Sequence, residues 1–166
     1  MRSKFHHAAI MLAATGLASV LAGAAPAQQP DTSAAATYRD IEATLGFVPG
    51  FFKAFPEAGI AGAWGEFKSV QLSTTTALPA KMKELIGLAV ASQIPCTYCI
   101  YFHTAMARAN GATEEEVREA VAMASITRHW STVLNGMQVD LSTFKAETDR
   151  ALRMAAEKAG TPAHTE

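Results

Sequence analysis

The chain is organised around residues 95–103, which read Pro-Cys-Thr-Tyr-Cys-Ile-Tyr-Phe-His. This stretch contains both cysteines of the 166-residue chain and one of its five histidines. Cys96, Cys99 and His103 form a C-x-x-C-x-x-x-H pattern. Such a pattern is compatible with a redox dithiol, with half of a metal site or with a small disulfide staple.

A staple is the weakest of these interpretations, because the two cysteines are only three positions apart. A disulfide across so short a loop removes little entropy from the unfolded chain, about 2 kcal/mol at most, and it links no distant segments. The spacing therefore favours chemistry over bracing.

Pro95 separates two predicted helices, because the residue before a proline is pushed out of the helical region. The upstream helix opens at Pro79. The downstream helix starts at Cys96 and runs to about Asn110, where Gly111 suits a left-handed cap. An antiparallel helix pair is therefore expected. The apolar side of the upstream helix is expected to consist of Met82, Leu85, Ile86, Ala89 and Val90.

The rest of the chain also favours helices. A helix after Pro56 has an apolar stripe with one polar end, formed by Ile60, Trp64, Phe67 and Gln71. Thr113 and Glu116 form a capping box for a helix that continues to 135–136. Further helices are expected over 37–45 and 143–158. The large side chains interpreted as core residues, with a role in a substrate pocket as the alternative, are Phe51, Phe52 and Phe55. No stretch has the period-two alternation of a β-strand, so the predicted fold is all-α, a bundle of about six helices.

The first 27 residues have the features of a secretory signal peptide. Arg2 and Lys4 precede an apolar run over 8–22, and Ala25-Pro26-Ala27 has the small-x-small form of a cleavage site. The run is too short to span a bilayer, and no other stretch is apolar for long enough. The predicted organisation is a signal peptide at 1–27, a disordered linker at 28–36 and one helical domain at 37–160. We expect the mature protein to be periplasmic or secreted.

The charge of the predicted mature chain argues against two classes of partner. The whole chain has 14 basic and 15 acidic residues; without Arg2 and Lys4 these become 12 and 15, a formal charge of −3. Such a chain has no basic stripe for nucleic acid and no polybasic patch for anionic lipid. We therefore expect neither nucleic acid nor a membrane surface as a partner.

The helix that starts at Cys96 carries its reactive side chains on one face, at i, i+3 and i+7. Both thiols lie near the helix start, where free backbone N–H groups and the helix dipole stabilise a thiolate. Glu84 lies about 15 Å back from the turn and His103 about 12 Å forward, so the two should be nearly level. A carboxylate beside an imidazole fixes its tautomer and raises its basicity. The candidate site residues are Glu84, Cys96, Cys99 and His103.

These four residues, with the Glu-Leu-Ile-Gly-Leu-Ala-Val-Ala run at 84–91 and Gly111-Ala112, resemble the alkyl hydroperoxidase D core motif. That motif belongs to the carboxymuconolactone decarboxylase superfamily, and the resemblance covers about residues 47–125. It implies an all-helical fold that assembles as a homotrimer or hexamer. It also implies a peroxiredoxin-type oxidoreductase, that is, a thiol-dependent peroxidase acting on a small hydroperoxide.

The resemblance also implies roles for the residues. Cys99 would attack the peroxide, Cys96 would close the disulfide, and His103 and Glu84 would relay protons. No bound cofactor is implied, because an external dithiol or thioredoxin-like donor would return the electrons. Tyr98 stands where the founding enzyme of the family has a histidine, so any help from that ring would be lost, and the usual cytosolic donor does not suit an exported chain.

Several alternatives stay open on the sequence. One is a redox-sensing or binding module that forms the disulfide without efficient turnover. Another is a non-redox, decarboxylase-like enzyme on the same fold, although the intact dithiol counts against it. A third is metal binding by the same four residues. His129 and Trp130 are interpreted as packing residues at a helix or subunit contact, with a role in the pocket as the alternative.

Overall fold

The computed structural model describes residues 31–160, which contain seven α-helices and no strand. The predicted all-α fold is confirmed. All of these helices lie in one compact unit that begins at Ser33. The predicted signal peptide at 1–27 lies outside the described residues. Within residues 31–160, no helix has both the length and the apolar character needed to cross a membrane.

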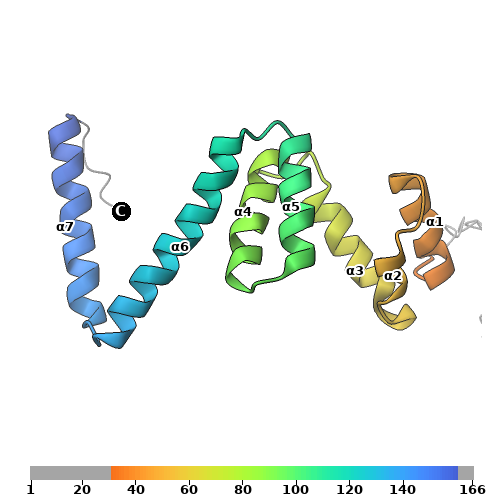
Figure 1. Ribbon diagram of the computed structural model, residues 1–166, viewed down its shortest axis with the longest axis horizontal. Coiled ribbons are helices and arrows are strands. Elements are labelled where there is room, and N and C mark those ends of the chain that lie inside the picture. Colours follow the sequence, from red (N-terminus) through yellow and green to blue (C-terminus); the bar gives the residue numbers. More distant parts are fainter. Residues whose placement is uncertain (1–30, 161–166) are drawn as a thin grey trace, which may run out of the picture. The chain divides into compact units, whose positions relative to one another are not determined.

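The helical elements follow the chain in a simple order (Figure 1). They are α1 (Ala34–Leu45), α2 (Gly50–Lys53), the 3-10 turn η1 (Glu57–Gly59), α3 (Ile60–Glu66), the π-helical turn η2 (Phe67–Gln71), α4 (Ala80–Gln93), α5 (Thr97–Ala109), α6 (Glu114–Gly136) and α7 (Leu141–Ala159). The bounds of α4, α5 and α6 agree with the sequence predictions, because prolines and a glycine mark their ends.

Helix α1 starts earlier than predicted, inside the stretch 28–36 that was expected to be a disordered linker. Ser33 is its N-cap, and the Ser33 Oγ accepts a hydrogen bond from the backbone N–H of Ala36 at 3.2 Å. Three alanines follow the cap, and alanine is the strongest helix former. Residues 34–36 are therefore helical.

A small hydrophobic core joins α1, α2 and α3. Its buried members are Ile41, Phe52, Ile60 and Trp64. Asp40 on α1 adds a polar link, because it accepts hydrogen bonds from Trp64 Nε1 at 2.6 Å and from Lys68 Nζ at 2.7 Å. The hydrogen bond from Lys68, followed by that from Trp64, holds the pKa of Asp40 below its usual range.

The three phenylalanines around α2 do not all enter this core. Phe52 is buried, whereas Phe51 is 60% exposed and Phe55 is 47% exposed. Helix α2 has only four residues, and neighbouring side chains on a helix point about 100° apart. Only one of the two adjacent phenylalanines can therefore face the core, so the core interpretation was wrong for Phe51 and Phe55.

Helices α4 and α5 lie side by side and run in opposite directions, and α6 packs against α4 (Figure 1). The turn between α4 and α5 is tight, because the N–H of Cys96 donates to the carbonyl of Ala91 at 3.1 Å. The buried residues of this pair are Glu84, Leu88 and Ala91 on α4 and Ala107 on α5.

The buried face of α4 differs from the apolar side expected from the sequence. Met82, Ile86 and Val90 are 46%, 46% and 55% exposed, although they belong to that expected side. Glu84 is buried instead, because partners on neighbouring segments form hydrogen bonds with its carboxylate and offset the cost of burial. Part of the apolar surface of α4 is therefore left uncovered.

The predicted capping box starts α6 and also fastens it to α4. Thr113 Oγ1 accepts from the N–H of Glu116 at 3.1 Å, and Glu116 Oε2 accepts from the N–H of Thr113 at 2.8 Å. Lys81 on α4 donates to the other oxygen of Glu116 at 2.7 Å. The hydrogen bond from Lys81, followed by that from the Thr113 backbone, lowers the pKa of Glu116.

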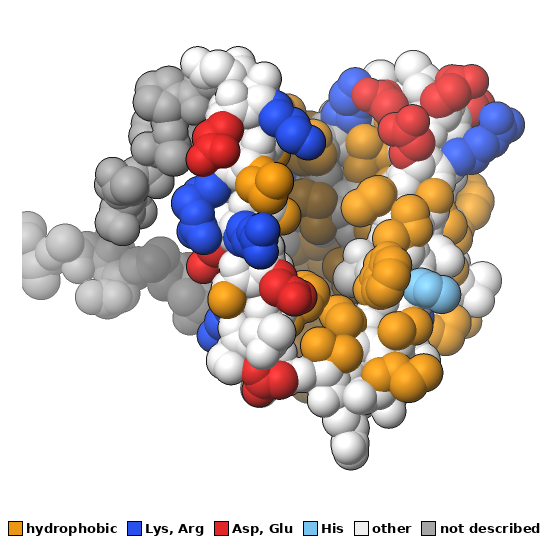
Figure 2. All heavy atoms as spheres, turned by 90° about the vertical axis from the view of Figure 1, so that its left-hand side faces the viewer, with side chains coloured by type: hydrophobic (Ala, Val, Ile, Leu, Met, Phe, Trp, Pro, Cys, Tyr) orange, Lys and Arg blue, Asp and Glu red, His pale blue; other side chains and the backbone are white. Residues whose placement is uncertain are grey.

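Helix α7 buries none of its residues. Asp140 caps it, and hydrogen bonds from the Ser142 hydroxyl and the Thr143 backbone lower the pKa of Asp140 to about 2. Large apolar side chains remain exposed on α6 and α7, namely Val121, Met123, Ile126, Trp130, Leu141, Phe144, Leu152 and Met154. Figure 2 shows hydrophobic side chains gathered over a hollowed face on the side where these two helices lie. This surface has the character of one that another molecule covers.

Candidate active site

The two cysteines lie at the start of α5. Cys96 is the N-cap, and its Sγ accepts a hydrogen bond from the backbone N–H of Cys99 at 3.3 Å. The Cα atoms of the two residues are 5.3 Å apart, and their side chains are joined as a disulfide. In the reduced state, free N–H groups and the helix dipole at this end of α5 favour negative charge on sulfur.

Glu84 and His103 meet between α4 and α5. His103 Nδ1 lies 2.7 Å from Glu84 Oε2, although the residues are 19 positions apart. Glu84 is only 2% exposed and the side chain of His103 is 19% exposed. The expectation that the two side chains lie level is confirmed. An imidazole that donates its Nδ1–H to a carboxylate keeps Nε2 as an acceptor for another proton.

Gly87 gives this pair its space on α4. It follows Glu84 by three residues, and a Cβ at Gly87 would lie 2.5 Å from Nδ1 and 2.8 Å from Nε2 of His103. The imidazole therefore rests against the backbone of α4. A glycine inside a helix costs about 1 kcal/mol relative to alanine, and this contact explains its presence. Sequence periodicity does not identify Gly87, although a glycine within a helical pattern is a signal for close packing.

A cavity of about 790 Å³ opens beside Cys99 and His103. Its aromatic lining consists of Phe51, Phe67, Tyr98, Tyr101 and Phe102, and its polar lining adds Gln71 and Thr97. The Phe102 ring packs edge-on against the His103 ring at 5.3 Å and lies 6.2 Å from the Phe67 ring. Cys99 lines this cavity and Cys96 does not. One cysteine is thus presented to a large apolar space, next to the imidazole.

Two residues of this cavity, Phe51 and Gln71, were not among the four candidate site residues. Phe51 lines the cavity, which agrees with the alternative interpretation from the sequence and not with the core interpretation. Gln71, noted only as the polar end of an apolar stripe, also lines it, and its Nε2 lies 3.3 Å from Glu84 Oε1. The polar interruption of that stripe was the one available signal for Gln71.

The remaining candidates from the sequence occupy different places. Tyr98, between the two cysteines, lines the cavity and is 88% exposed. His129 and Trp130 are exposed on α6, where their rings pack edge to face at 5.5 Å. Neither of them lines the cavity.

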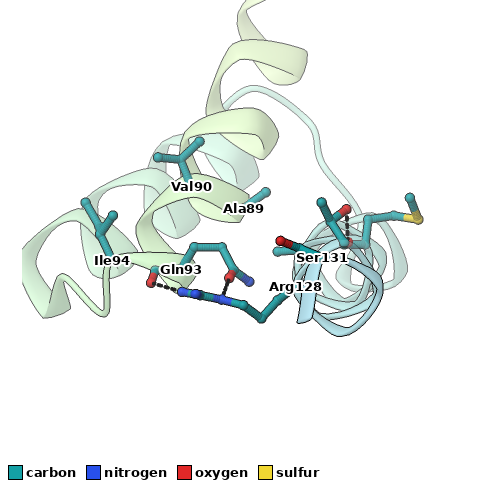
Figure 3. Close-up of a pocket in the computed structure, with 9 residues that line it drawn as sticks. Ala89, Val90, Gln93, Ile94, Arg128 and Ser131 are labelled. Atoms are coloured by element: carbon teal, nitrogen blue, oxygen red, sulfur yellow. Dashed lines mark hydrogen bonds between the residues drawn. The ribbon is translucent and has the colours of Figure 1, made fainter. Parts of the chain in front are cut away.

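A second hollow, of about 460 Å³, lies between α4 and α6 (Figure 3). Arg128 reaches across it, because its Nε donates to Gln93 Oε1 at 2.7 Å and its Nη2 donates to the Gln93 carbonyl at 3.2 Å. Its apolar wall on α4 includes Ala89, Val90 and Ile94. None of the four candidate site residues lines this hollow.

Within residues 31–160, no group of three or more His, Cys, Asp or Glu side chains is arranged to hold a metal ion. The four candidate residues form two pairs instead, the Cys96–Cys99 disulfide and the Glu84–His103 hydrogen bond. The second pair engages Nδ1 of the imidazole and not Nε2.

Comparison with known proteins identifies relatives of this architecture. Residues 58–140 match the carboxymuconolactone decarboxylase family. The fold is similar to the crystal structure of the alkylhydroperoxidase AhpD core from Rhodospirillum rubrum, with a TM-score of 0.58 and 31% sequence identity. That similarity covers 65% of this chain and 82% of the other.

Two curated proteins are also similar in sequence. One is an uncharacterised protein of Cupriavidus necator, 40% identical over 63 residues, which is 37% of this chain and 56% of the relative. The other is uncharacterised protein 4 in the cox locus of Paracoccus denitrificans, 42% identical over 52 residues, which is 31% of this chain and 47% of the relative. The chain thus spans about half the length of the curated relatives it matches.

Proposed function

This chain belongs to the carboxymuconolactone decarboxylase family, and on that premise we propose that it is a thiol-dependent peroxidase that uses Cys96 and Cys99. The observation that carries the proposal is a cysteine pair at a helix start beside the hydrogen-bonded pair of Glu84 and His103, with Cys99 and His103 lining one apolar cavity. A nucleophile, a base and an orienting carboxylate within one small region form the set that activates a thiol.

The proposed reaction has three steps. The Cys99 thiolate attacks the terminal oxygen of ROOH, the O–O bond breaks, and the alkoxide takes a proton from protonated His103 to leave as ROH. Cys99 is then a sulfenic acid, which the Cys96 thiol attacks to form the disulfide and release water. A dithiol donor reduces the disulfide and leaves as its own disulfide. Each cycle therefore converts one ROOH and one dithiol into ROH, water and one disulfide.

The assignment of Cys99 as the attacking residue is supported by access. Cys99 lines the cavity, whereas Cys96 does not. The sulfur of Cys96 accepts the Cys99 N–H and lies within disulfide distance, which suits the resolving role. The Glu84–His103 pair would accept the thiol proton and return it to the leaving group.

The lining of the cavity favours an organic hydroperoxide over hydrogen peroxide. Five of its residues are aromatic, and a volume of about 790 Å³ accommodates a substrate with a sizeable apolar body. Burying that body would lower KM for the organic substrate, since each methylene group removed from water contributes about 0.8 kcal/mol.

The electron donor would reach the disulfide from the surface. Tyr98 and Tyr101, on either side of Cys99, are 88% and 78% exposed. Exposed tyrosines are common at protein interfaces, so we propose that they contact a dithiol or thioredoxin-like protein. If the chain is exported, this donor belongs to the periplasmic or secreted compartment.

We further propose that the chain forms a homotrimer or hexamer through the exposed apolar surface of α6 and α7. A helix of 19 residues that buries nothing is marginal in water, so the apolar side of α7 requires a cover. A second copy of this chain supplies such a cover by symmetry.

A thiol titration combined with a turnover assay tests the peroxidase proposal. The reduced protein is mixed with one equivalent of cumene hydroperoxide, and free thiols are counted before and after dihydrolipoamide is added. We expect both thiols to be lost to an intramolecular disulfide and then recovered. The Cys99→Ser variant should consume no peroxide, whereas Cys96→Ser should react once and yield a sulfenic acid that dimedone traps.

Full turnover by the Cys99→Ser variant would refute the proposal. Oxidation that occurs once and is not reversed by any dithiol would instead identify a sensing module.

A further inference from the structure

An unusual turn of helix brings a residue outside the predicted site against its buried carboxylate. Helix α3 does not end regularly but passes into the π-helical turn η2, in which the N–H of Leu72 donates to the carbonyl of Phe67 at 3.1 Å. A π-turn takes one residue more than an α-turn and so changes the direction of the side chains that follow it. Gln71 is the last residue of this turn.

Gln71 contacts the same carboxylate as His103. Its Nε2 lies 3.3 Å from Oε1 of Glu84 and 3.5 Å from Oε2, while His103 Nδ1 lies 2.7 Å from Oε2. The two oxygens of this carboxylate therefore have different principal donors. Among the described residues, every buried side-chain nitrogen or oxygen has a hydrogen-bond partner. The partners of the Glu84 carboxylate oxygens are Gln71 and His103.

The segment around Gln71 is fastened to the same helix as its acceptor. Lys83, which precedes Glu84 on α4, donates to the carbonyl of Val70 at 2.6 Å and to that of Ser73 at 2.7 Å. These carbonyls lie on both sides of Gln71 along the chain, at the end of η2 where carbonyl groups lack helical partners. The position of Gln71 relative to Glu84 is therefore set by a charged clamp as well as by its own hydrogen bond.

We propose that Gln71 is a positioning residue that holds the Glu84 carboxylate in the orientation in which it contacts His103 Nδ1, and thereby keeps Nε2 of His103 as the acceptor for the Cys99 thiol proton. An amide NH₂ that donates to a buried carboxylate stabilises its charged form and opposes rotation of its side chain. A fixed carboxylate selects the Nδ1–H tautomer of the imidazole, with Nε2 free to take the thiol proton. The catalytic consequence of this inference, proton transfer from Cys99, rests on the proposed peroxidase function. The structural consequence, a fixed orientation of Glu84 and His103, does not.

The test combines a spectroscopic and a kinetic measurement on the full chain. Gln71→Met keeps the length of the side chain and removes the hydrogen-bond donor. Gln71→Asn keeps the amide but shortens the side chain by one methylene group, so the amide lies farther from Glu84. Val70→Ala is the matched control in the same turn. Val70 is 58% exposed, so its truncation leaves the contact with Glu84 in place. In reduced protein labelled with 15N-histidine, the His103 signals are assigned by their loss in His103→Asn.

We expect wild type and Val70→Ala to have the Nδ1–H tautomer, and both Gln71 variants to lose it partly. We also expect the rate of Cys99 oxidation by cumene hydroperoxide to fall about tenfold in both, since a hydrogen bond to a charged group corresponds to about that factor. KM should change less than twofold, because Gln71 acts on Glu84 and not on the substrate.

Unchanged His103 tautomers in both Gln71 variants would overturn the inference, whatever the peroxidase assay gives. A changed tautomer in an enzyme that consumes no peroxide would leave the positioning role intact and refute the proposed function alone. A rise in KM with an unchanged maximal rate would overturn the inference in favour of a substrate contact. If circular dichroism shows that Gln71→Met does not fold, the inference is judged from the His103 tautomer and the oxidation kinetics of Gln71→Asn.

Discussion

His103 Nδ1 lies 2.7 Å from Glu84 Oε2, and this contact joins α5 to a carboxylate that is almost completely removed from solvent on α4. A buried charge of this kind is tolerated only when donors surround it, so the pair constrains the two helices as well as the chemistry. It engages only one ring nitrogen of His103, a residue that lines the same cavity as Cys99. Structure and proposed mechanism therefore depend on the same two atoms.

The first prediction concerns a variant that removes the negative charge of Glu84 and keeps the shape of its side chain. In Glu84→Gln an amide replaces the carboxylate, so the imidazole loses its electrostatic partner while the packing is conserved. We expect the rate of Cys99 oxidation by cumene hydroperoxide to fall about 10- to 100-fold, in the range of general acid–base effects. Stopped-flow measurement on reduced protein checks this. Glu66→Gln, which alters an exposed carboxylate on α3, is the control, and an equal loss in both variants would contradict the role of Glu84.

The second prediction concerns the space that Gly87 leaves for the imidazole ring of His103. Gly87→Ala places a methyl group where the His103 ring now lies, because a Cβ there would come within 2.5 Å of Nδ1. The ring has to move away from α4, which lengthens its hydrogen bond to Glu84, so we expect at least a tenfold loss of the oxidation rate. The loss should occur although alanine has the higher helix propensity.

Gly62→Ala is the matched control, because nothing lies within 4 Å of a Cβ at this position of α3. It should keep full activity and raise the free energy of unfolding by up to about 1 kcal/mol. Activity at the wild-type level in Gly87→Ala would mean that the position of the ring is unimportant.

The Glu84–His103 contact could be predicted from the sequence because it depends on helix rise and on one turn. Pro95 fixes the reversal, and 1.5 Å per residue on either side brings both residues to the same level. Gly87 follows from neither rule, because the need for a glycine appears only once the ring of His103 is placed. Gln71 was missed for a similar reason, since the π-turn changes the direction of its side chain away from the α-helical pattern.

The buried face of α4 could not be predicted for a different physical reason. Periodicity assigns apolar residues to the inside of the same chain, yet Met82, Ile86 and Val90 are about half exposed. A sequence pattern records that an apolar side must be covered, but not whether the cover comes from this chain or from another molecule. The same ambiguity explains why Phe51 was assigned to the core and lies at the cavity instead.

The third prediction concerns the hydrogen bond between Lys81 on α4 and Glu116 on α6, and the pH dependence of the stability that it contributes. The hydrogen bonds from Lys81 and the Thr113 backbone lower the pKa of Glu116 below its usual value of 4.5. The unfolded state therefore binds the proton first as pH falls, and the contribution of Glu116 to stability is complete above pH 4.5. It is lost as the pH falls through the lower pKa of the folded state.

Urea unfolding of wild type and Glu116→Gln between pH 7 and pH 3 measures this. The wild type should be the more stable protein at pH 7, and the difference should shrink toward pH 3. Glu115→Gln, an exposed neighbour on the same turn, should show a smaller difference at every pH. A difference between wild type and Glu116→Gln that stays constant with pH would show that the charge of Glu116 is not involved.

The fourth prediction concerns the exposed apolar surface. Ile126 on α6 is 49% exposed, so a lysine there costs little in an isolated chain but would bury a charge if a second copy covers this surface. We expect Ile126→Lys to shift the protein from an oligomer toward a monomer, as measured by light scattering coupled to gel filtration. Ser125→Lys, which adds the same charge at the next exposed position, should leave the mass unchanged. A wild-type protein that is monomeric at micromolar concentration would refute this assembly outright, and an Ile126→Lys variant with the wild-type mass would remove α6 from the interface.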